Sequence, residues 1–209
     1  MGYRQAGGTL LDAGCAGTIS LWPGSLTTAA VNARGYHRMR TAVALGSNLG
    51  DRLENLQAAR RQILQLNEVH PPILSSGIYE TEPVDCERDA SKFLNAVVEF
   101  DYDGDSGQLL EQLARIEESL GRKRNHQKNV SRTIDIDLLY CGDRQIDNER
   151  LQLPHPRMHL RKFVLQPLVD IRPDLILPNQ RKTIRQLLAE LEGSEEGVRF
   201  TDDWQCRIL

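Results

Sequence analysis

The sequence has little that would point to cross-links, a cysteine-bound metal or a membrane. Its 209 residues include only four cysteines, which are widely scattered and never spaced as C-x-x-C: Cys15, Cys86, Cys141 and Cys206. Neither a zinc site nor a disulfide framework is therefore predicted. No apolar run reaches the roughly 18 residues that a membrane-spanning helix needs. The net charge of −3 gives no overall attraction to nucleic acid. We expect a protein of the reducing cytoplasm that binds neither membranes nor nucleic acid.

Residues 1–38 lack the patterns of a folded segment. They are rich in Gly, Ala and Thr and show neither helical nor strand periodicity. We expect a poorly ordered N-terminal extension over residues 1–38 and one catalytic domain over residues 39–209, which is long enough to bury one substantial core. Met39 directly precedes the first clear strand and is therefore a candidate natural start.

The rest of the chain alternates between strand and helix periodicity. The expected order is strand, helix, strand, strand, helix, strand, over residues 40–46, 51–66, 73–81, 93–102, 106–121 and 131–140. Asp51 suits the N-cap of the first helix, and Gly121 suits the end of the second. This order predicts an α+β fold with a ferredoxin-like βαββαβ core, in which an antiparallel sheet carries both helices on one face. Residues 162–171 and 183–191 are expected to add C-terminal helices.

The segment SRTIDIDLLY, residues 131–140, is apolar but carries two aspartates. Because strand side chains alternate between faces, Asp135 and Asp137 share one face, while Ile134, Ile136 and Leu138 share the other. Neighbouring carboxylates repel each other, so a functional arrangement needs a cation between them. Mg²⁺ is bound by one or two carboxylates together with substrate phosphates. The alternative, on this strand alone, is a solvated polar face at the edge of a sheet.

Basic residues crowd the segment just before this strand: Arg122, Lys123, Arg124, Lys128 and Arg132. Arginine binds phosphates bidentately and lysine binds them as a point charge, so a polyphosphate could lie between this segment and a metal on the aspartates. In isolation such a run is more often a solvated basic turn. Its position beside two carboxylates favours a phosphoryl-transfer site, where positioning and charge neutralisation do most of the catalysis.

Two other motifs give weaker signals. GSNLGD, residues 46–51, lies between a strand and a helix, but it has neither the G-x-G-x-x-G pattern nor the ending of a P-loop, so a tight turn explains it equally well. His155 and His159 have the i, i+4 spacing of helical zinc ligands, but Pro154 and Pro156 disfavour a regular helix there. A zinc site is therefore not predicted.

Six blocks of sequence, taken together, resemble the 6-hydroxymethyl-7,8-dihydropterin pyrophosphokinase family of folate biosynthesis. They are ALGSNLGDR (44–52), YETEPV (79–84), FLNAVVEF (93–100), IEESLGRKR (116–124), SRTIDIDLL (131–139) and LPHPRMHLRKFVLQPL (153–168), in the order found in that family. The resemblance implies transfer of pyrophosphate from ATP to the hydroxymethyl group of the pterin, with release of AMP and with two Mg²⁺ ions. It also makes residues 39–209 a pyrophosphokinase domain.

The resemblance also implies roles for individual residues. The pterin-binding positions are Thr81, Val84 and Asn95, with Phe93 and Phe163 as the rings that sandwich the heterocycle. Without the family, each Phe could equally be an ordinary core residue. The positions that contact or support ATP are Glu117, Arg122, Arg132, His155 and Arg161. Arg122 and Arg124 are implied to assist catalysis, and Asp135 and Asp137 to hold both Mg²⁺ ions.

Two other classes of function stay open at this point. A ferredoxin-like binding module, regulatory or RNA-binding, should carry exposed sheet aromatics of the RNP kind, which the sequence does not show. A metal-dependent phosphohydrolase could use the same aspartates, and it would release phosphate from ATP without any pterin. We expect a monomer whose partners are ATP and 6-hydroxymethyl-7,8-dihydropterin.

Overall fold

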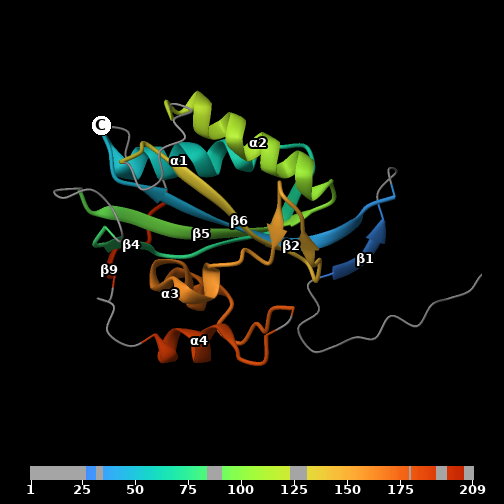
Figure 1. The fold of residues 1–209 in the computed structure, drawn as a ribbon. Coiled ribbons are helices and arrows are strands. Elements are labelled where there is room, and N and C mark those ends of the chain that lie inside the picture. Colours follow the sequence, from blue (N-terminus) through green and yellow to red (C-terminus); the bar gives the residue numbers. More distant parts are fainter. Residues whose placement is uncertain are drawn as a thin grey trace, which may run out of the picture.

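A seven-stranded antiparallel sheet, counted over the described residues, forms the middle layer of the computed structural model (Figure 1). The structure describes residues 27–31, 35–83, 91–122, 131–178, 180–191 and 197–204. The strands of this sheet are β1 (Thr27–Val31), β2 (His37–Ser47), β3 (Val69–Ser75), β4 (Ile78–Thr81), β5 (Phe93–Tyr102), β6 (Asp135–Cys141) and β9 (Val198–Thr201). The helices are α1 (Arg52–Ile63), α2 (Ser106–Ser119), α3 (Lys162–Ile171) and α4 (Ile184–Glu190). β7 (Ile146–Asp147) and β8 (Gln152–Leu153) form a separate hairpin, and residues Met158–Leu160 form a 3₁₀ turn.

Strand β2 is an inner strand of the sheet. It pairs with β5 along one side and with β6 along the other. β1 pairs with the first residues of β2, beyond the end of the β6 ladder. β3 and β4 follow each other along the far side of β5, and β9 pairs with the outer side of β4. The order through the core is therefore β6–β2–β5–β4–β9, with every pair antiparallel.

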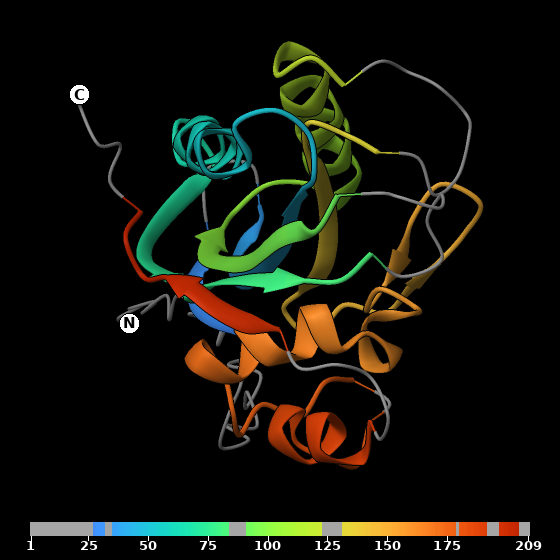
Figure 2. The same cartoon turned by 90° about the vertical axis from the view of Figure 1, so that its left-hand side faces the viewer.

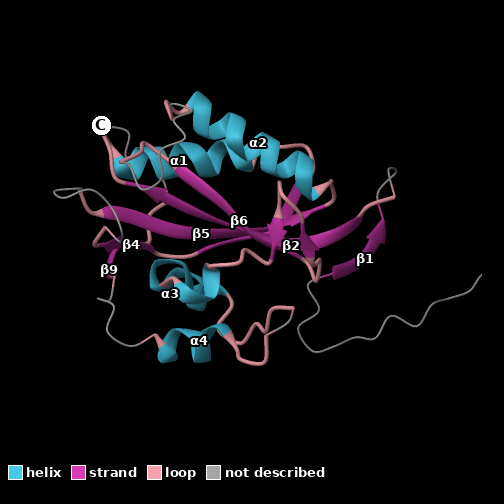
Figure 3. Cartoon of the chain, viewed as in Figure 1, coloured by secondary structure: helices cyan, strands magenta, loops and turns pink. Residues whose placement is uncertain are grey.

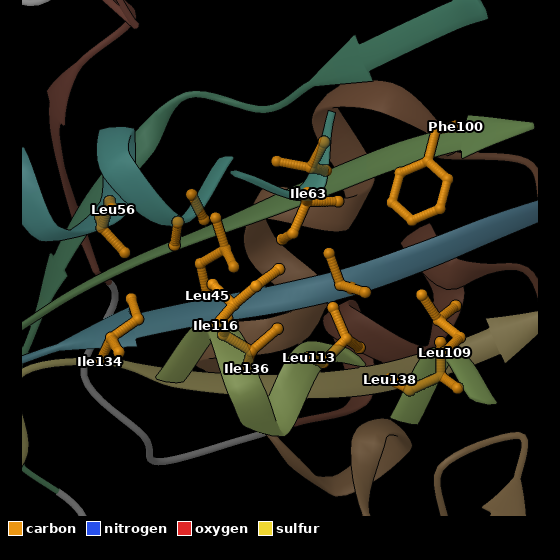
Figure 4. Close-up of a cluster of buried hydrophobic side chains, with 14 of the residues drawn as sticks. Leu45, Leu56, Ile63, Phe100, Leu109, Leu113, Ile116, Ile134, Ile136 and Leu138 are labelled. Atoms are coloured by element: carbon orange, nitrogen blue, oxygen red, sulfur yellow. The ribbon is translucent and has the colours of Figure 1, made fainter. Parts of the chain in front are cut away.

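Helices cover both faces of the sheet (Figures 1 and 3). α1 and α2 lie on one face, as the sequence predicts, and α3 and α4 lie on the other. Alternate strand residues build the core beneath α1 and α2, where Leu45, Ile136 and Leu138 pack with Leu56 and Leu113 of the helices (Figure 4). A second core beneath α3 and α4 contains Val97, Leu165, Leu168 and Ile184.

The ends of the helices follow the expected local signals. Oδ1 of Asp51 accepts a hydrogen bond from the backbone N–H of Glu54 at 3.0 Å, so Asp51 is the N-cap of α1 as predicted. Gly121 has a φ of 90° just beyond α2, a conformation that favours glycine and confirms the predicted end of that helix. Thr183 caps α4 through a reciprocal pair of hydrogen bonds with Gln186.

The prediction of one strand over residues 73–81 is wrong, because this stretch belongs to two strands. β3 begins earlier, at Val69, and the chain leaves the ladder at Ser76 and Gly77. The backbone N–H of Ser76 donates to the carbonyl of Val97 at 3.0 Å, and its Oγ accepts from the Val97 N–H at 2.9 Å. The Ser76 side chain thus accepts a hydrogen bond that a backbone carbonyl would accept in a regular ladder, and β4 begins after this interruption.

Part of the predicted extension over residues 1–38 pairs with the sheet. Thr27–Val31 forms β1, and β2 begins at His37 rather than near residue 40. Backbone hydrogen bonds hold a strand such as β1 at the sheet edge, so apolar alternation was not needed for it to pair. The remaining parts of the extension, residues 1–26 and 32–34, lie outside the described residues.

A buried charge cluster joins α3 to the sheet. The carboxylate of Glu99 on β5 is fully buried and accepts hydrogen bonds from Arg40, from Arg172 and from the hydroxyl of Tyr140. Burial by itself would raise the pKa of Glu99, but the hydrogen bonds from Arg172 and Tyr140 and the charge of Arg40 lower it overall. The cluster therefore keeps a charged carboxylate under α3.

The described helices are short. α2, with 14 residues, is the longest of them, and none is long and apolar enough to span a bilayer. Cys141 on β6 is a buried free thiol.

Candidate active site

Side chains from three adjacent strands meet on the face of the sheet that α3 covers. Gly46 of β2 pairs with Asn95 of β5 on one side and with Asp135 of β6 on the other. A methyl group on Gly46 would lie 3.1 Å from Oδ1 of Asn95 and 4.0 Å from Cβ of Asp135. The row Asn95–Gly46–Asp135 therefore brings a predicted pterin residue and a predicted metal ligand to the two sides of one glycine.

Asp137 continues this row one step along β6. It pairs with Ala44, which packs against the core beneath α3, whereas Ile136 and Leu138 belong to the core beneath α1 and α2. The alternation expected from the sequence is thus present, and both aspartates lie on the α3 side. Their side chains keep 29% and 35% exposure, enough for a ligand to reach them.

Two arginines bracket the carboxylate of Asp135. Nη1 of Arg122 lies 2.7 Å from its Oδ1, and Nη1 of Arg132 lies 2.9 Å from the same oxygen. These arginines are the first and last of the basic segment noted in the sequence. The structure places both beside the aspartates, where they balance one negative charge with two positive ones.

Glu117, on the last turn of α2, also contacts this group of charged side chains. It pairs with Arg122, and its Oε1 accepts a hydrogen bond from the backbone N–H of Ile136 at 2.7 Å. Burial raises the pKa of Glu117 to about 7, against the lowering effect of Arg122. The nearby charge of Asp135 raises it further. Glu117 therefore ties α2 to β6 between the two aspartates.

Arg161 pairs with Asp137, as the other two arginines pair with Asp135. Its Nη1 lies 3.1 Å from Oδ2 of Asp137, and its guanidinium lies over the ring of Phe163, 5.4 Å from the centroid. Both residues stand at the start of α3. The beginning of this helix thus supplies a cation and an aromatic ring to the same face.

His155 lies close to Asp137 on the outer side of the site. Its backbone N–H donates to the carbonyl of Leu139 at 2.7 Å, which fixes the loop against β6. Burial lowers the pKa of His155, although the charge of Asp137 acts to raise it. A hollow of about 390 Å³ opens between Asp137, His155, Leu110 and the hairpin residues 148–152. This hollow has room for part of a nucleotide beside the aspartates.

The predicted pterin residues of β4 and β5 lie on the other side of Gly46. Nδ2 of Asn95 donates to Oγ1 of Thr81 at 2.7 Å, and Asn95 itself is buried. The half-buried ring of Phe93 would lie 3.9 Å from a methyl group on Gly46. Polar amide and hydroxyl groups beside an aromatic ring suit a flat, hydrogen-bonding heterocycle.

Asn48 is a site residue that sequence reasoning missed. Its Oδ1 accepts from the backbone N–H of Arg132 at 2.7 Å, and its own N–H donates to the carbonyl of Arg132 at 3.2 Å. Its Nδ2 donates to Oγ of Ser131 at 3.0 Å and to the carbonyl of Ser91 at 3.4 Å. Asn48 belongs to the motif GSNLGD, which looked like a simple turn because the residues that Asn48 contacts are distant in the sequence.

The ligands that the site offers to a metal ion are carboxylates. Within the described ranges, no group of three or more His, Cys, Asp or Glu side chains gathers to hold a metal ion. Asp135 and Asp137 would therefore contribute two carboxylates and leave the remaining positions to other oxygens. This donor set fits Mg²⁺, which keeps waters and takes substrate phosphates as further ligands. Two predicted site residues, Val84 and Arg124, lie outside the described residues.

Known proteins resemble this chain in sequence. The family described as 7,8-dihydro-6-hydroxymethylpterin-pyrophosphokinase (HPPK) matches residues 42–173. A 2-amino-4-hydroxy-6-hydroxymethyldihydropteridine pyrophosphokinase from Haemophilus influenzae is 40% identical over 149 residues, which cover 71% of this chain and 88% of the relative. A protein of the same name from Pseudomonas aeruginosa is 39% identical over 158 residues, which cover 75% and 95%.

Solved structures resemble it in fold. Wild-type HPPK-DHPS from Plasmodium falciparum, determined with pterin and p-hydroxybenzoate, superposes with a TM-score of 0.56 at 17% identity. The match covers 74% of this chain and 43% of that longer chain. At this level of identity the likeness concerns the fold.

Proposed function

The chain belongs to the 7,8-dihydro-6-hydroxymethylpterin pyrophosphokinase family, and we propose that the row Asn95–Gly46–Asp135 is the line along which its two substrates meet. The chain transfers pyrophosphate from ATP to hydroxymethyldihydropterin, a step of folate biosynthesis. ATP is its co-substrate, and AMP and the pterin diphosphate are its products. We assign the pterin to the Asn95 side of Gly46 and the triphosphate to the Asp135 side.

The spacing of the strands supports this assignment. Asn95 and Asp135 are separated by two strand spacings, roughly 9–10 Å at the usual distance between neighbouring strands. That span suits a two-ring heterocycle whose hydroxymethyl arm points toward the aspartates. Thr81 and Asn95 would hydrogen-bond the ring edge, together with Val84, and Phe93 and Phe163 would stack on its faces.

The arginines are suited to the phosphates. Arg122, Arg132 and Arg161 each pair with a carboxylate of the site. When a triphosphate enters, these guanidinium groups can turn to its oxygens and leave Asp135 and Asp137 to two Mg²⁺ ions, whose charge would neutralise the transferring group. Glu117 and His155 would bound the ATP side, and Arg124 would assist.

Catalysis in this arrangement rests on positioning and charge. The pterin hydroxyl must face the β-phosphorus in line with the leaving AMP oxygen, at about 3–3.5 Å. The arginines stabilise the charge that develops on the transferred group. The fixed row of strands supplies the alignment, because neither half of the site can move without breaking ladder hydrogen bonds.

We also propose the wider setting of the site. The core from β2 to β6 is ferredoxin-like, because its strand order β6–β2–β5–β4 carries α1 and α2 on one face, and α3 and α4 are C-terminal additions to it. Residues 39–209 make up the pyrophosphokinase domain, which acts as a monomer in the cytoplasm, where a buried free thiol such as Cys141 stays reduced.

One incubation tests the proposed function. The chain is mixed with ATP, Mg²⁺ and 6-hydroxymethyl-7,8-dihydropterin, and the nucleotides are separated by chromatography. AMP should appear in step with pterin diphosphate and should stop when EDTA removes the metal. Formation of ADP and phosphate without pterin would point to a phosphohydrolase, and unchanged ATP would point to a binding module.

A further inference from the structure

The C-terminal strand is tied to α3 by an amide pair that the reaction itself does not require. Nε2 of Gln166 on α3 donates to the carbonyl of Gly197 at 3.0 Å, and the N–H of Gly197 donates to Oε1 of Gln166 at 3.0 Å. A side chain thus pairs with a backbone in the way that two strands pair. Gly197 lies beyond residues 42–173, the range that the family matches.

Gly197 also lies beside a predicted pterin residue, with no room for a side chain between them. A methyl group on Gly197 would lie 2.8 Å from Cγ2 of Thr81, closer than real side chains approach. The other branch of the Thr81 side chain, Oγ1, accepts the hydrogen bond from Asn95 at 2.7 Å. The hydroxyl of Thr81 is therefore fixed by Asn95, and its methyl group faces Gly197, where any side chain would displace it.

The same contacts reach the second wall of the pterin pocket. Gln166 stands one helical turn after Phe163 on α3, so residues three apart on this helix share a face. Figure 2 shows β9 (red) alongside β4 and next to α3. Gly197 thus joins α3, which carries Phe163, next to Thr81 of β4, and a second link between these elements runs from the Tyr79 hydroxyl of β4 to Asp170 of α3 at 2.9 Å.

The far end of β9 is fastened independently. Nη2 of Arg199 donates to the hydroxyl of Tyr79 at 2.8 Å and to Oδ2 of Asp170 at 2.7 Å. Nε1 of Trp204 donates to the carbonyl of Ser76 at 2.8 Å. Because these contacts anchor the strand outside the pocket, loss of the Gln166 pair alone would leave β9 paired with β4.

We propose that Gln166 and Gly197 are positioning residues for the pterin, which set the separation between Thr81 and the Phe163 ring. The inference rests on the proposed function, because it takes the pterin to lie between these two walls. Neither residue touches the substrate in this proposal. They act on the pterin indirectly, through the position of Thr81 and through the orientation of α3, which carries Phe163.

Two variants test the pair from opposite sides. Gln166→Met keeps the length of the side chain and removes both hydrogen bonds. Gly197→Ala keeps both hydrogen-bonding partners but places a methyl group 2.8 Å from Thr81 and 3.3 Å from Oε1 of Gln166. The matched control is Gln186→Met, which makes the same change where the side chain caps α4, away from the pocket. KM for pterin, KM for ATP, kcat and the melting temperature are measured for each full-length variant.

Gln166→Met is expected to raise the pterin KM roughly five- to tenfold, the equivalent of about one neutral hydrogen bond, with the ATP KM within about twofold. Gly197→Ala should shift it in the same direction. Gln186→Met should lower the melting temperature and leave both KM values in place. A change in the pterin KM alone would indicate a positioning role, because a general loss of stability would change the KM values of both substrates.

The outcomes also separate the two levels of the inference. If the parent chain does not form AMP in a pterin-dependent way, the proposed function fails. If the parent is active but a folded Gln166→Met variant has a pterin KM within about twofold of the parent, only the positioning role is overturned. A parallel rise of both KM values would equally overturn it. Should Gln166→Met not fold, an unchanged pterin KM in Gly197→Ala decides against the proposal.

Discussion

Replacing Gly46 by alanine should separate pterin binding from stability. The added methyl group would lie 3.1 Å from Oδ1 of Asn95, tighter than ordinary van der Waals contact, so the amide must move by a few tenths of an ångström. That movement strains the 2.7 Å hydrogen bond from Asn95 to Thr81 and withdraws the amide from the position we assign to pterin recognition. The methyl meets Asp135 only at 4.0 Å, so the metal side should be little changed.

The size of the effect follows from one neutral hydrogen bond. Loss or misalignment of such a bond costs about 0.5–1.5 kcal/mol, which predicts a roughly three- to tenfold rise in the pterin KM. Alanine also restricts the unfolded chain and so favours folding by about 0.4–1 kcal/mol at a position where it fits. That gain offsets much of the close contact, so the melting temperature should stay within about 3 °C of the parent.

Gly50→Ala is the matched control, because it places the same methyl group in open space. Gly50 has a φ of 66°, where alanine is strained, and nothing lies within 4 Å of the added carbon. This variant should lose stability and keep the pterin KM, the reverse of Gly46→Ala. Steady-state kinetics with each substrate varied in turn, together with thermal melts, would decide. A pterin KM unchanged in Gly46→Ala, or raised equally in both variants, would refute the reasoning.

Three further substitutions probe the metal, the stacking ring and the buried charge. Asp137→Asn should keep the melting temperature and abolish turnover, since an amide binds Mg²⁺ far more weakly than a carboxylate; near-normal kcat would contradict the metal assignment. Phe93→Ala should weaken pterin binding by about 1–3 kcal/mol, the range for bases stacked on aromatic rings, and equal weakening for ATP would argue against stacking. The pKa of Glu99 lies below its ordinary 4.5, so its charge stabilises the fold above that pH and this contribution is lost as the pH falls through the lowered pKa. Glu99→Gln should therefore lower the free energy of unfolding by about 3 kcal/mol near neutral pH, and a gap from the parent that does not shrink in acidic urea titrations would contradict this.

Local signals in the sequence were enough for most of the core elements. The apolar run FLNAVVEFDY gave β5 with its observed bounds, and the capping residues Asp51 and Gly121 gave the ends of α1 and α2. These elements depend on residues that are close together in the chain. β1 and β9 were not predicted. β1 (TTAAV) shows no apolar alternation and is held by backbone pairing with β2, whereas β9 (VRFT) alternates over only four residues and pairs with β4, which is distant in the chain.

The same distinction applies to the site. Period-two alternation was sufficient to place Asp135 and Asp137 on one face, and the basic segment before them pointed to the arginines. Nothing local could show that Gly46 lies between Asn95 and Asp135, because that depends on the register of three strands. The contact of Gly197 with Thr81 was equally hidden, since 116 residues separate the two in the chain.

Asn48 links the two segments that lead into β5 and β6. This side chain, 2% exposed, bonds to Ser91 at the approach to β5 and to Ser131 and Arg132 at the approach to β6. The amide hydrogen of Arg132 is held by the oxygen of Asn48, so it can exchange with solvent only when that contact breaks. Loss of the Asn48 contacts would release the segments that lead into β5 and β6 together, while both strands stay paired with β2. Asn48 therefore couples the segment before β5, which carries Asn95, to the segment before β6, which carries Asp135.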